Sequence, residues 1–219
     1  MPDGSTAICY AEDVAKKFTT AYPQGFEHHY WRPEKLSEPG RLKQPARIFI
    51  DSMSDLFGHW VPAEQVQAVL DMARAAPWHT FQSLTKNAPR LRKFALPENL
   101  WAGVSSPPDS FMGQPLSRTQ QEKMLHRSLD ILSQLAVPVR WMSFEPLSWD
   151  VAPIVAQYPG ALRWAVIGAA SNGPRIYQAD AVLVSRLLDT LGRQGVPIFF
   201  KGNLKGCAAA EPWREEFPA

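Results

Sequence analysis

The chain has 219 residues, of which 45% are hydrophobic and 11% aromatic, and this composition predicts one ordered α/β domain over residues 1–219 rather than a disordered chain. The 23 basic and 21 acidic side chains leave a net charge of +2, which makes no strong case for a nucleic-acid or membrane partner, although a local basic face stays open. No apolar run approaches a membrane-spanning length, and two cysteines do not make a disulfide framework, so we expect a cytoplasmic protein.

Short apolar segments rich in β-formers recur along the chain, and most are continuous runs rather than alternating ones. Such runs are typical of strands that are covered on both faces. The segments are ARIFIDS (46–52), TFQSLTK (80–86), LWAGVSS (100–106), VRWMSFE (139–145), LRWAVIGAA (162–170) and VPIFFKG (196–202). Residues 23–45, rich in proline, glycine and charge, are expected to form a long irregular connection.

Helical patterns lie between these segments. An apolar stripe at helical spacing predicts a helix over 63–76, and a weaker pattern covers 88–95. A capping box that begins at Ser117 predicts the start of another helix. Asp180 is expected to cap a third helix, which ends near Gly195.

The alternation of strands and helices predicts parallel pairing with right-handed crossovers. Such units form either an open doubly wound sheet or a barrel. No GxGxxG or Walker motif follows any strand, which removes the best support for a nucleotide-binding doubly wound fold. We therefore expect a partial (β/α) barrel of the TIM-barrel type, with about six parallel strands and flanking helices.

Function in parallel α/β folds gathers where strands end. Lys86, Glu145 and Lys201 each terminate a very apolar run, and charges there must point into a cleft or pair with one another. We expect Glu145 and Lys201 to share a pocket, where Glu145 with Lys86 or Lys201 could act as an acid–base pair. The alternative is a purely structural ion pair that closes the barrel mouth.

The N-terminal segment ICYAEDVAKKF places Cys9 at the start of an amphipathic helix, far along the chain from Cys207. With these segments, the chain resembles a widespread bacterial and bacteriophage family of unassigned function related to radical S-adenosylmethionine (SAM) enzymes. The matching stretches are CYAEDVAKKF (9–18), RPEKLSEPGRLKQPARIFIDSMSDLFG (32–58), HTFQSLTKNAPRLRKF (79–94), LWAGVS (100–105), VRWMSFEPL (139–147), VIGAASNG (166–173) and VPIFFKG (196–202).

The resemblance implies a radical SAM-like partial barrel whose first strand leads into a loop holding a [4Fe–4S] cluster, with SAM bound at the open iron. Family members carry a C-x6-C-x2-C-Y-A motif. Cys9 matches its last cysteine, whereas the lead-in MPDGSTAI supplies neither of the other two, and the strand before the loop also has no counterpart here. Further polar residues follow the predicted strands and are candidates for binding the cofactor, namely Ser52, Asp55, Ser105, Ser171 and Asn172. The resemblance retains all of these positions except that of Asn172.

Two later motifs depart from the family pattern. The usual Gly-Gly-Glu-Ser reads GAAS at 168–171, and Lys-Gln-Trp-Gly reads KGNL at 201–204, which retains Lys201. Three hypotheses follow: a radical SAM-type enzyme whose N-terminus is truncated, a divergent member that lost the cluster and serves as a binding or interaction protein, or a metal-free enzyme that uses Glu145 with Lys86 or Lys201. We expect that the chain as written cannot hold a conventional three-cysteine cluster. The substrate, the oligomeric state and the binding of any other cluster or of SAM are left open.

Overall fold

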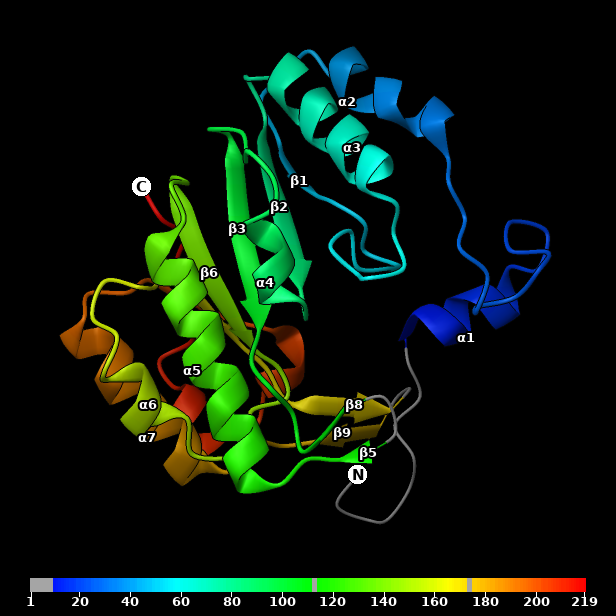
Figure 1. Ribbon diagram of the computed structural model, residues 1–219. Coiled ribbons are helices and arrows are strands. Elements are labelled where there is room, and N and C mark those ends of the chain that lie inside the picture. The colour runs from blue at the N-terminus through cyan, green and yellow to red at the C-terminus, as the bar shows by residue number, and fades with distance from the viewer. Residues whose placement is uncertain (1–9, 112–113, 173–174) are drawn as a thin grey trace.

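The computed structural model describes residues 10–111, 114–172 and 175–219, and the fold is α/β. A sheet of parallel strands curls into a half-barrel, in the order β1-β2-β3-β6-β7-β10 (Figure 1). Each strand lies inside a segment predicted from the sequence. The strands are β1 (Arg47–Phe49), β2 (Thr80–Thr85), β3 (Leu100–Ser105), β6 (Val139–Phe144), β7 (Trp164–Ile167) and β10 (Ile198–Phe200).

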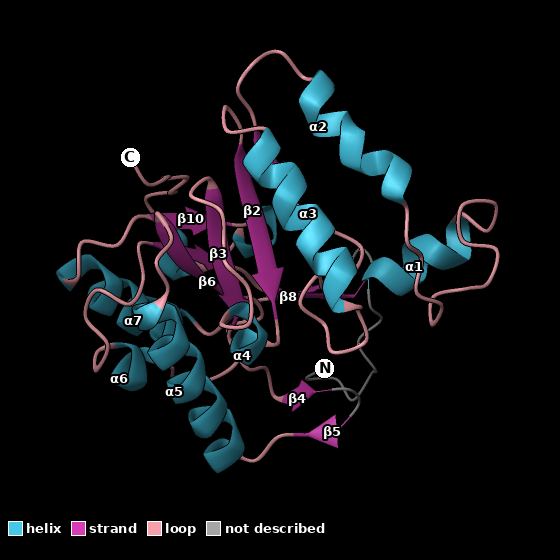
Figure 2. Ribbon diagram, turned by 45° about the horizontal axis from the view of Figure 1, so that its top comes forward, coloured by secondary structure: helices cyan, strands magenta, loops and turns pink. Residues whose placement is uncertain are grey.

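Helices connect consecutive strands and cover one face of this sheet (Figures 1 and 2). Because every strand pairs in parallel with the next one along the chain, all six carboxyl ends meet at the same edge. The connecting helices are α3 (Ala63–Ala75), α4 (Ala88–Leu91), α5 (Arg118–Gln134), α6 (Ala152–Val155) and α7 (Ala181–Arg193).

The predicted helix starts are present as hydrogen-bonded caps. The Ser117 hydroxyl accepts from Gln120 N at 3.3 Å, and Ser117 N donates to Gln120 Oε1 at 2.8 Å, which completes the capping box of α5. The Asp180 carboxylate accepts from Val182 N at 2.7 Å at the start of α7. Gly195 lies just beyond α7 with a φ of 67°, a conformation that glycine adopts without a steric penalty.

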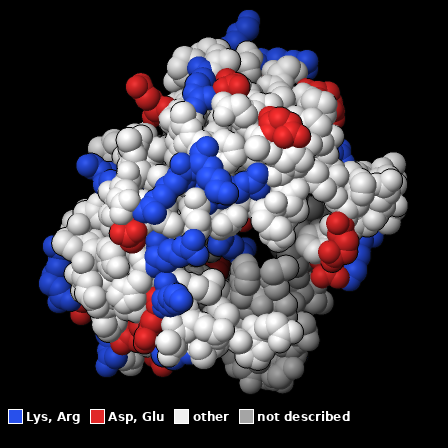
Figure 3. Space-filling model, viewed as in Figure 1, with Lys and Arg blue, Asp and Glu red and all other residues white. Residues whose placement is uncertain are grey.

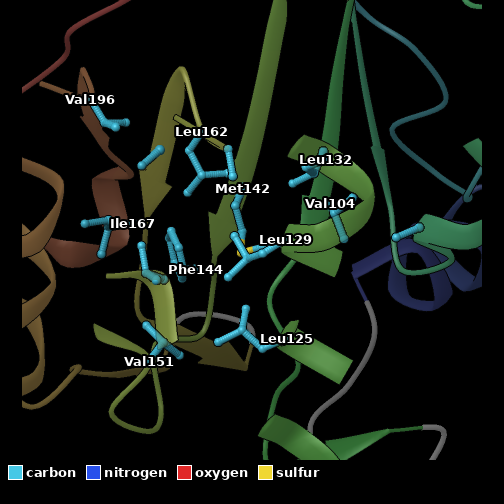
Figure 4. Close-up of a cluster of buried hydrophobic side chains, with 14 of the residues drawn as sticks. Val104, Leu125, Leu129, Leu132, Met142, Phe144, Val151, Leu162, Ile167 and Val196 are labelled. Atoms are coloured by element: carbon cyan, nitrogen blue, oxygen red, sulfur yellow. The ribbon is translucent and has the colours of Figure 1, made fainter. Parts of the chain in front are cut away.

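The main core lies between the sheet and its helices. Figure 4 shows Leu125, Leu129 and Leu132 of α5 pointing toward Met142 and Phe144 of β6, and all five are fully buried. Alternate residues of the strands therefore face the helices, which explains the continuous apolar runs in the sequence.

A second apolar cluster occupies the opposite, concave face of the sheet. Trp101, Trp141 and Trp164 come from adjacent strands, and their rings pack edge-on or tilted, with the Trp164 centroid 5.7 Å from Trp101 and 5.1 Å from Trp141. The C-terminal segment runs back along β10, where Phe200 N donates to Arg214 O at 2.8 Å. Phe217 then stacks on Trp164 at 5.3 Å, so aromatic rings fill the amino-terminal part of the concave face.

Smaller elements lie outside the half-barrel. The N-terminal helix α1 (Tyr10–Lys17) precedes a 3-10 turn (Pro33–Ser37) and α2 (Glu38–Arg41), so the connection expected to be irregular over 23–45 contains short helices. Two short hairpins, β4 (Ser110–Phe111) with β5 (Gln114–Pro115) and β8 (Ala170–Asn172) with β9 (Arg175–Tyr177), follow β3 and β7. Two further 3-10 turns, Gly202–Leu204 and Ala208–Ala210, follow β10. Among the helices of the described ranges, none has the length and apolarity that crossing a bilayer requires.

Candidate functional site

An ion pair between two strand exits lies at the mouth of the half-barrel. Glu145 directly follows β6 and Lys201 directly follows β10, and the Lys201 Nζ lies 2.9 Å from Glu145 Oε2. Their side chains are 23% and 48% exposed, respectively, so the pair is reachable from solvent. The two residues therefore meet as the sequence predicts, although they come from strands that are not adjacent.

A glycine makes this meeting possible. Gly168 directly follows the intervening strand β7, and a Cβ on it would lie 3.1 Å from both Cγ and Cδ of Glu145. A larger residue would push the Glu145 side chain away, because contacts this short are rarely tolerated. The glycine of the GAAS stretch thus lets the carboxylate reach across β7 toward Lys201.

Asn203 holds the carboxylate from the other side. Its Nδ2 donates to Glu145 Oε1 at 3.2 Å and to Ala169 O at 2.8 Å, while its Oδ1 accepts from Ala169 N at 3.2 Å. In the sequence Asn203 stands at the exit of the last strand, two positions after Lys201, but no motif assigns it a role.

A second polar group lies at the ends of β1 and β2. The Asp55 carboxylate accepts from Phe57 N at 3.0 Å, from Thr85 Oγ1 at 3.0 Å and from Lys86 N at 2.8 Å. Both Asp55 oxygens are therefore engaged by the protein. This network fixes the backbone at the exit of β2 and so determines where Lys86 leaves the sheet.

Lys86 belongs to the mouth but not to the ion pair. It ends a strand two places from β6 in the sheet, which corresponds to a backbone separation of about 10 Å from Glu145. Lys86 is exposed, and within the described residues its ammonium makes no ion pair. Ser105, the last residue of β3 and half-buried, lies on the strand between them and pairs in register with Ser143.

The remaining predicted positions are more scattered. Ser52 is exposed in the turn after β1, and Ser171 is exposed in β8. Asn172 ends β8, where its backbone pairs with Arg175. Cys9 lies outside the described residues. The structure therefore joins Glu145 with Lys201, and Asp55 with the backbone of Lys86, rather than gathering all these residues around one point.

Asp51, which follows β1, has the one carboxyl group in the described ranges with a clearly raised pKa. Loss of hydration, followed by repulsion from Asp55, raises the pKa of Asp51 to about 6, while His29 opposes the change. Its backbone has a φ of 57°, the left-handed conformation that aspartate and asparagine tolerate better than most residues. No motif in the sequence assigns a role to Asp51.

The family resemblance implies two bound groups, a [4Fe–4S] cluster and SAM, and the described residues suit only the second of them. No cluster of three or more His, Cys, Asp or Glu side chains suited to a metal occurs within them. Cys207 is buried, with its thiol 3.7 Å from Ala179 O, and does not face a ligand set. They therefore do not fit a [4Fe–4S] cluster, whereas the Glu145–Lys201 pair offers both charges that the α-ammonium and α-carboxylate of SAM require.

These features define an α/β half-barrel protein with a charged pair at its carboxyl-end mouth. The chain belongs to a family described as a protein of unknown function, DUF5131, whose family model matches residues 4–209. Neither the curated proteins nor the solved structures include a significant match to this chain.

Proposed function

We propose that this chain is a radical SAM-like protein of the kind found in bacteria and their phages, and that it binds SAM at the half-barrel mouth without holding a complete [4Fe–4S] cluster. The observation that carries the proposal is the solvent-accessible Glu145–Lys201 pair at the carboxyl edge of a curled parallel sheet. The substrate is left open. We also propose that the protein is located in the cytoplasm.

The opposite charges of Glu145 and Lys201 lie side by side, which suits a ligand that carries both a positive and a negative group. The methionyl part of SAM ends in an ammonium and a carboxylate, which Glu145 and Lys201 can bind respectively once they exchange their mutual contact for the ligand. Asn203 would keep Glu145 in place during this exchange, because it also bonds both backbone groups of Ala169. In radical SAM enzymes the cluster binds these same two groups; here protein side chains would take that role.

Titration calorimetry with SAM tests this proposal. We expect binding by the unaltered protein and at least a tenfold weaker affinity for Glu145→Gln and for Lys201→Met, because each leaves one charge of the ligand without a partner. Lys205→Met, which removes a nearby exposed lysine that contacts the Trp213 ring instead, is the matched control. Unchanged affinity in the two site variants would contradict the assignment.

The cluster part of the proposal has a separate test. Anaerobic reconstitution with iron and sulfide should give no stoichiometric [4Fe–4S] absorbance or paramagnetic signal, since the sequence holds two cysteines and one of them is buried. A full cluster that cleaves SAM would refute this part and leave the binding assignment to be judged on the variants alone.

A binding or interaction protein without SAM is the second candidate, and no SAM binding by the unaltered protein in the calorimetry would favour it. The metal-free acid–base alternative uses Glu145 with Lys86 or Lys201. Of these two pairs, only Glu145 and Lys201 are joined by a contact among the described residues.

A further inference from the structure

We infer that the outer surface around α4 and α5 binds single-stranded nucleic acid. Figure 3 shows Lys and Arg side chains gathered over the middle of the face that carries these two helices. This face lies outside the half-barrel, so the inference is independent of SAM binding at the mouth. We call it the basic face, and its members are Arg90, Arg92, Lys93, Lys123 and Arg127.

The basic face is poorly neutralised by the protein. Lys123 and Arg127 are exposed one helical turn apart on α5, an arrangement that destabilises a helix through like-charge repulsion. Within the described ranges, Lys93 forms no ion pair, and neither do these two. The chain as a whole is nearly neutral, so this local excess of positive charge is a feature of the fold rather than of the composition.

Acidic residues near the basic face do not cancel it. Asp130 is engaged by Arg92, whose Nη2 lies 3.1 Å from Asp130 Oδ2 and 2.6 Å from Gln134 Oε1. This contact joins the end of α4 to α5 and makes the two basic stripes one continuous surface. Glu122 forms no ion pair with a described residue, so it is not bound to any cation of the basic face.

A hollow of about 390 Å³ adjoins the basic face, with His59, Asn87, Arg90, Lys93 and Phe94 among its lining residues. The Arg90 guanidinium donates to the carbonyls of Gly58 and Val61, which fixes the 58–61 turn to α4. Lys93 supplies an ammonium at this hollow that makes no ion pair with a described residue, and an ammonium is the donor that a phosphate group would use.

An exposed aromatic ring is held beside the hollow. Trp60 is 49% exposed, and its indole lies so close to Gly58 that a Cβ there would be 2.5 Å from Trp60 Cζ2. The ring also contacts His59 edge-on, with centroids 5.0 Å apart. The indole is therefore fixed in place while part of its surface stays open to solvent.

Unpaired cations beside a fixed, exposed indole favour single-stranded nucleic acid over other polyanions. Phosphates would contact the lysine and arginine side chains, and an unstacked base could stack on Trp60. A duplex hides its base faces and would leave the indole unused. An anionic membrane would be expected to engage a basic amphipathic helix with an apolar face, whereas the apolar face of α5 is buried against the sheet.

Fluorescence anisotropy with a fluorescein-labelled 20-mer of deoxythymidine tests the inference. We expect Trp60→Ala to weaken binding about tenfold, since stacking on one base is lost. Trp78→Ala is the matched control, because Trp78 is 43% exposed and lies outside the basic face, two residues before β2. Equal affinity of the Trp60 variant and the unaltered protein would contradict the stacking role and overturn the inference.

Charge is tested separately. The double variant Lys93→Gln and Arg127→Gln should make the plot of log affinity against log salt concentration less steep. The slope should become less negative by about 1.4, the value for two lost phosphate contacts on a single strand. Arg41→Gln with Lys43→Gln removes the same charge elsewhere and should leave the slope unchanged. The inference is overturned if the protein does not bind the 20-mer at low salt, or if the unaltered protein and the Lys93 and Arg127 double variant have equal slopes. It is also overturned if a 20-base-pair duplex binds more tightly, or if the protein binds only phosphatidylserine vesicles.

Discussion

The Arg47 guanidinium lies 3.7 Å from the centre of the Phe217 ring, so the first strand of the sheet meets the segment that borders the last one. Phe217 also stacks on Trp164, whose indole nitrogen donates to Glu216 O at 2.8 Å. The C-terminal segment thus spans the amino-terminal end of the half-barrel and links its two edges.

Phe217→Ala should therefore lower the free energy of unfolding by about 1–2 kcal/mol, because it removes the stack on Trp164 and the cation–π contact with Arg47. Thermal and urea unfolding measure this change. Phe18→Ala, at a phenylalanine that is 53% exposed and follows α1, is the control and should have almost no effect. Equal stability of the two variants would show that the segment does not brace the barrel.

Gly103 and Gly192 should respond to alanine in opposite directions. At Gly103 in β3 a Cβ would overlap the Trp141 indole, so Gly103→Ala should destabilise the protein by about 1–3 kcal/mol. At Gly192 in α7 a Cβ would meet no atom within 4 Å, so Gly192→Ala should stabilise the helix by about 0.5–1 kcal/mol. Urea denaturation of both variants checks the pair, and a stable Gly103→Ala would contradict the packing of the tryptophan cluster.

Asp51 should make stability depend on pH between about 4 and 6. Its pKa is raised from the ordinary 3.8 to about 6, so the folded state holds the proton more tightly than the unfolded state. Its contribution to stability is complete below pH 4 and is lost as the pH rises through 6. The residue as a whole is exposed although its carboxyl group loses hydration, so solvent screening limits the change to about 1 kcal/mol.

Asp51→Asn is the variant that checks this, since asparagine also tolerates the left-handed backbone. The stability difference between the unaltered protein and Asp51→Asn should move in favour of the variant from pH 4 to pH 6 and then level off. A difference that stays constant over this range would contradict the raised pKa.

Asp55→Asn should destabilise the protein by about 1–3 kcal/mol, because an amide nitrogen cannot accept the bonds that Thr85 and Lys86 donate to Asp55 Oδ2. Asp71→Asn, at an exposed helix residue paired with Arg74, is the matched control and should change little. Urea denaturation compares the two. Similar small effects would mean that Asp55 does not fix the exit of β2.

Local sequence signals predicted the strands and helices because they report on burial and capping. Continuous apolar runs located all six strands of the sheet, and the capping residues Ser117 and Asp180 located the starts of α5 and α7. The short α2 was missed, since a four-residue helix that contains Pro39 and Gly40 has no periodicity to detect. The charged strand exits Glu145 and Lys201 were identified because a charge that ends an apolar run requires a partner.

Other features depend on distances that no local pattern encodes. Gly168 admits the Glu145 side chain only because β6 and β10 flank β7, and Asn203 supports it only because the turn after β10 folds back onto Ala169. The basic face likewise joins residues from α4 and α5 that the near-neutral overall charge conceals.

The amino-acid sequence alone determined which segments become strands and helices and which charges end the strands, because burial, period and caps act over a few residues. The tertiary structure decided which of those charges meet, which aromatic rings share the concave face and where positive charge accumulates. These outcomes depend on strand order and on the curl of the sheet, which bring residues far apart in the chain to within bonding distance.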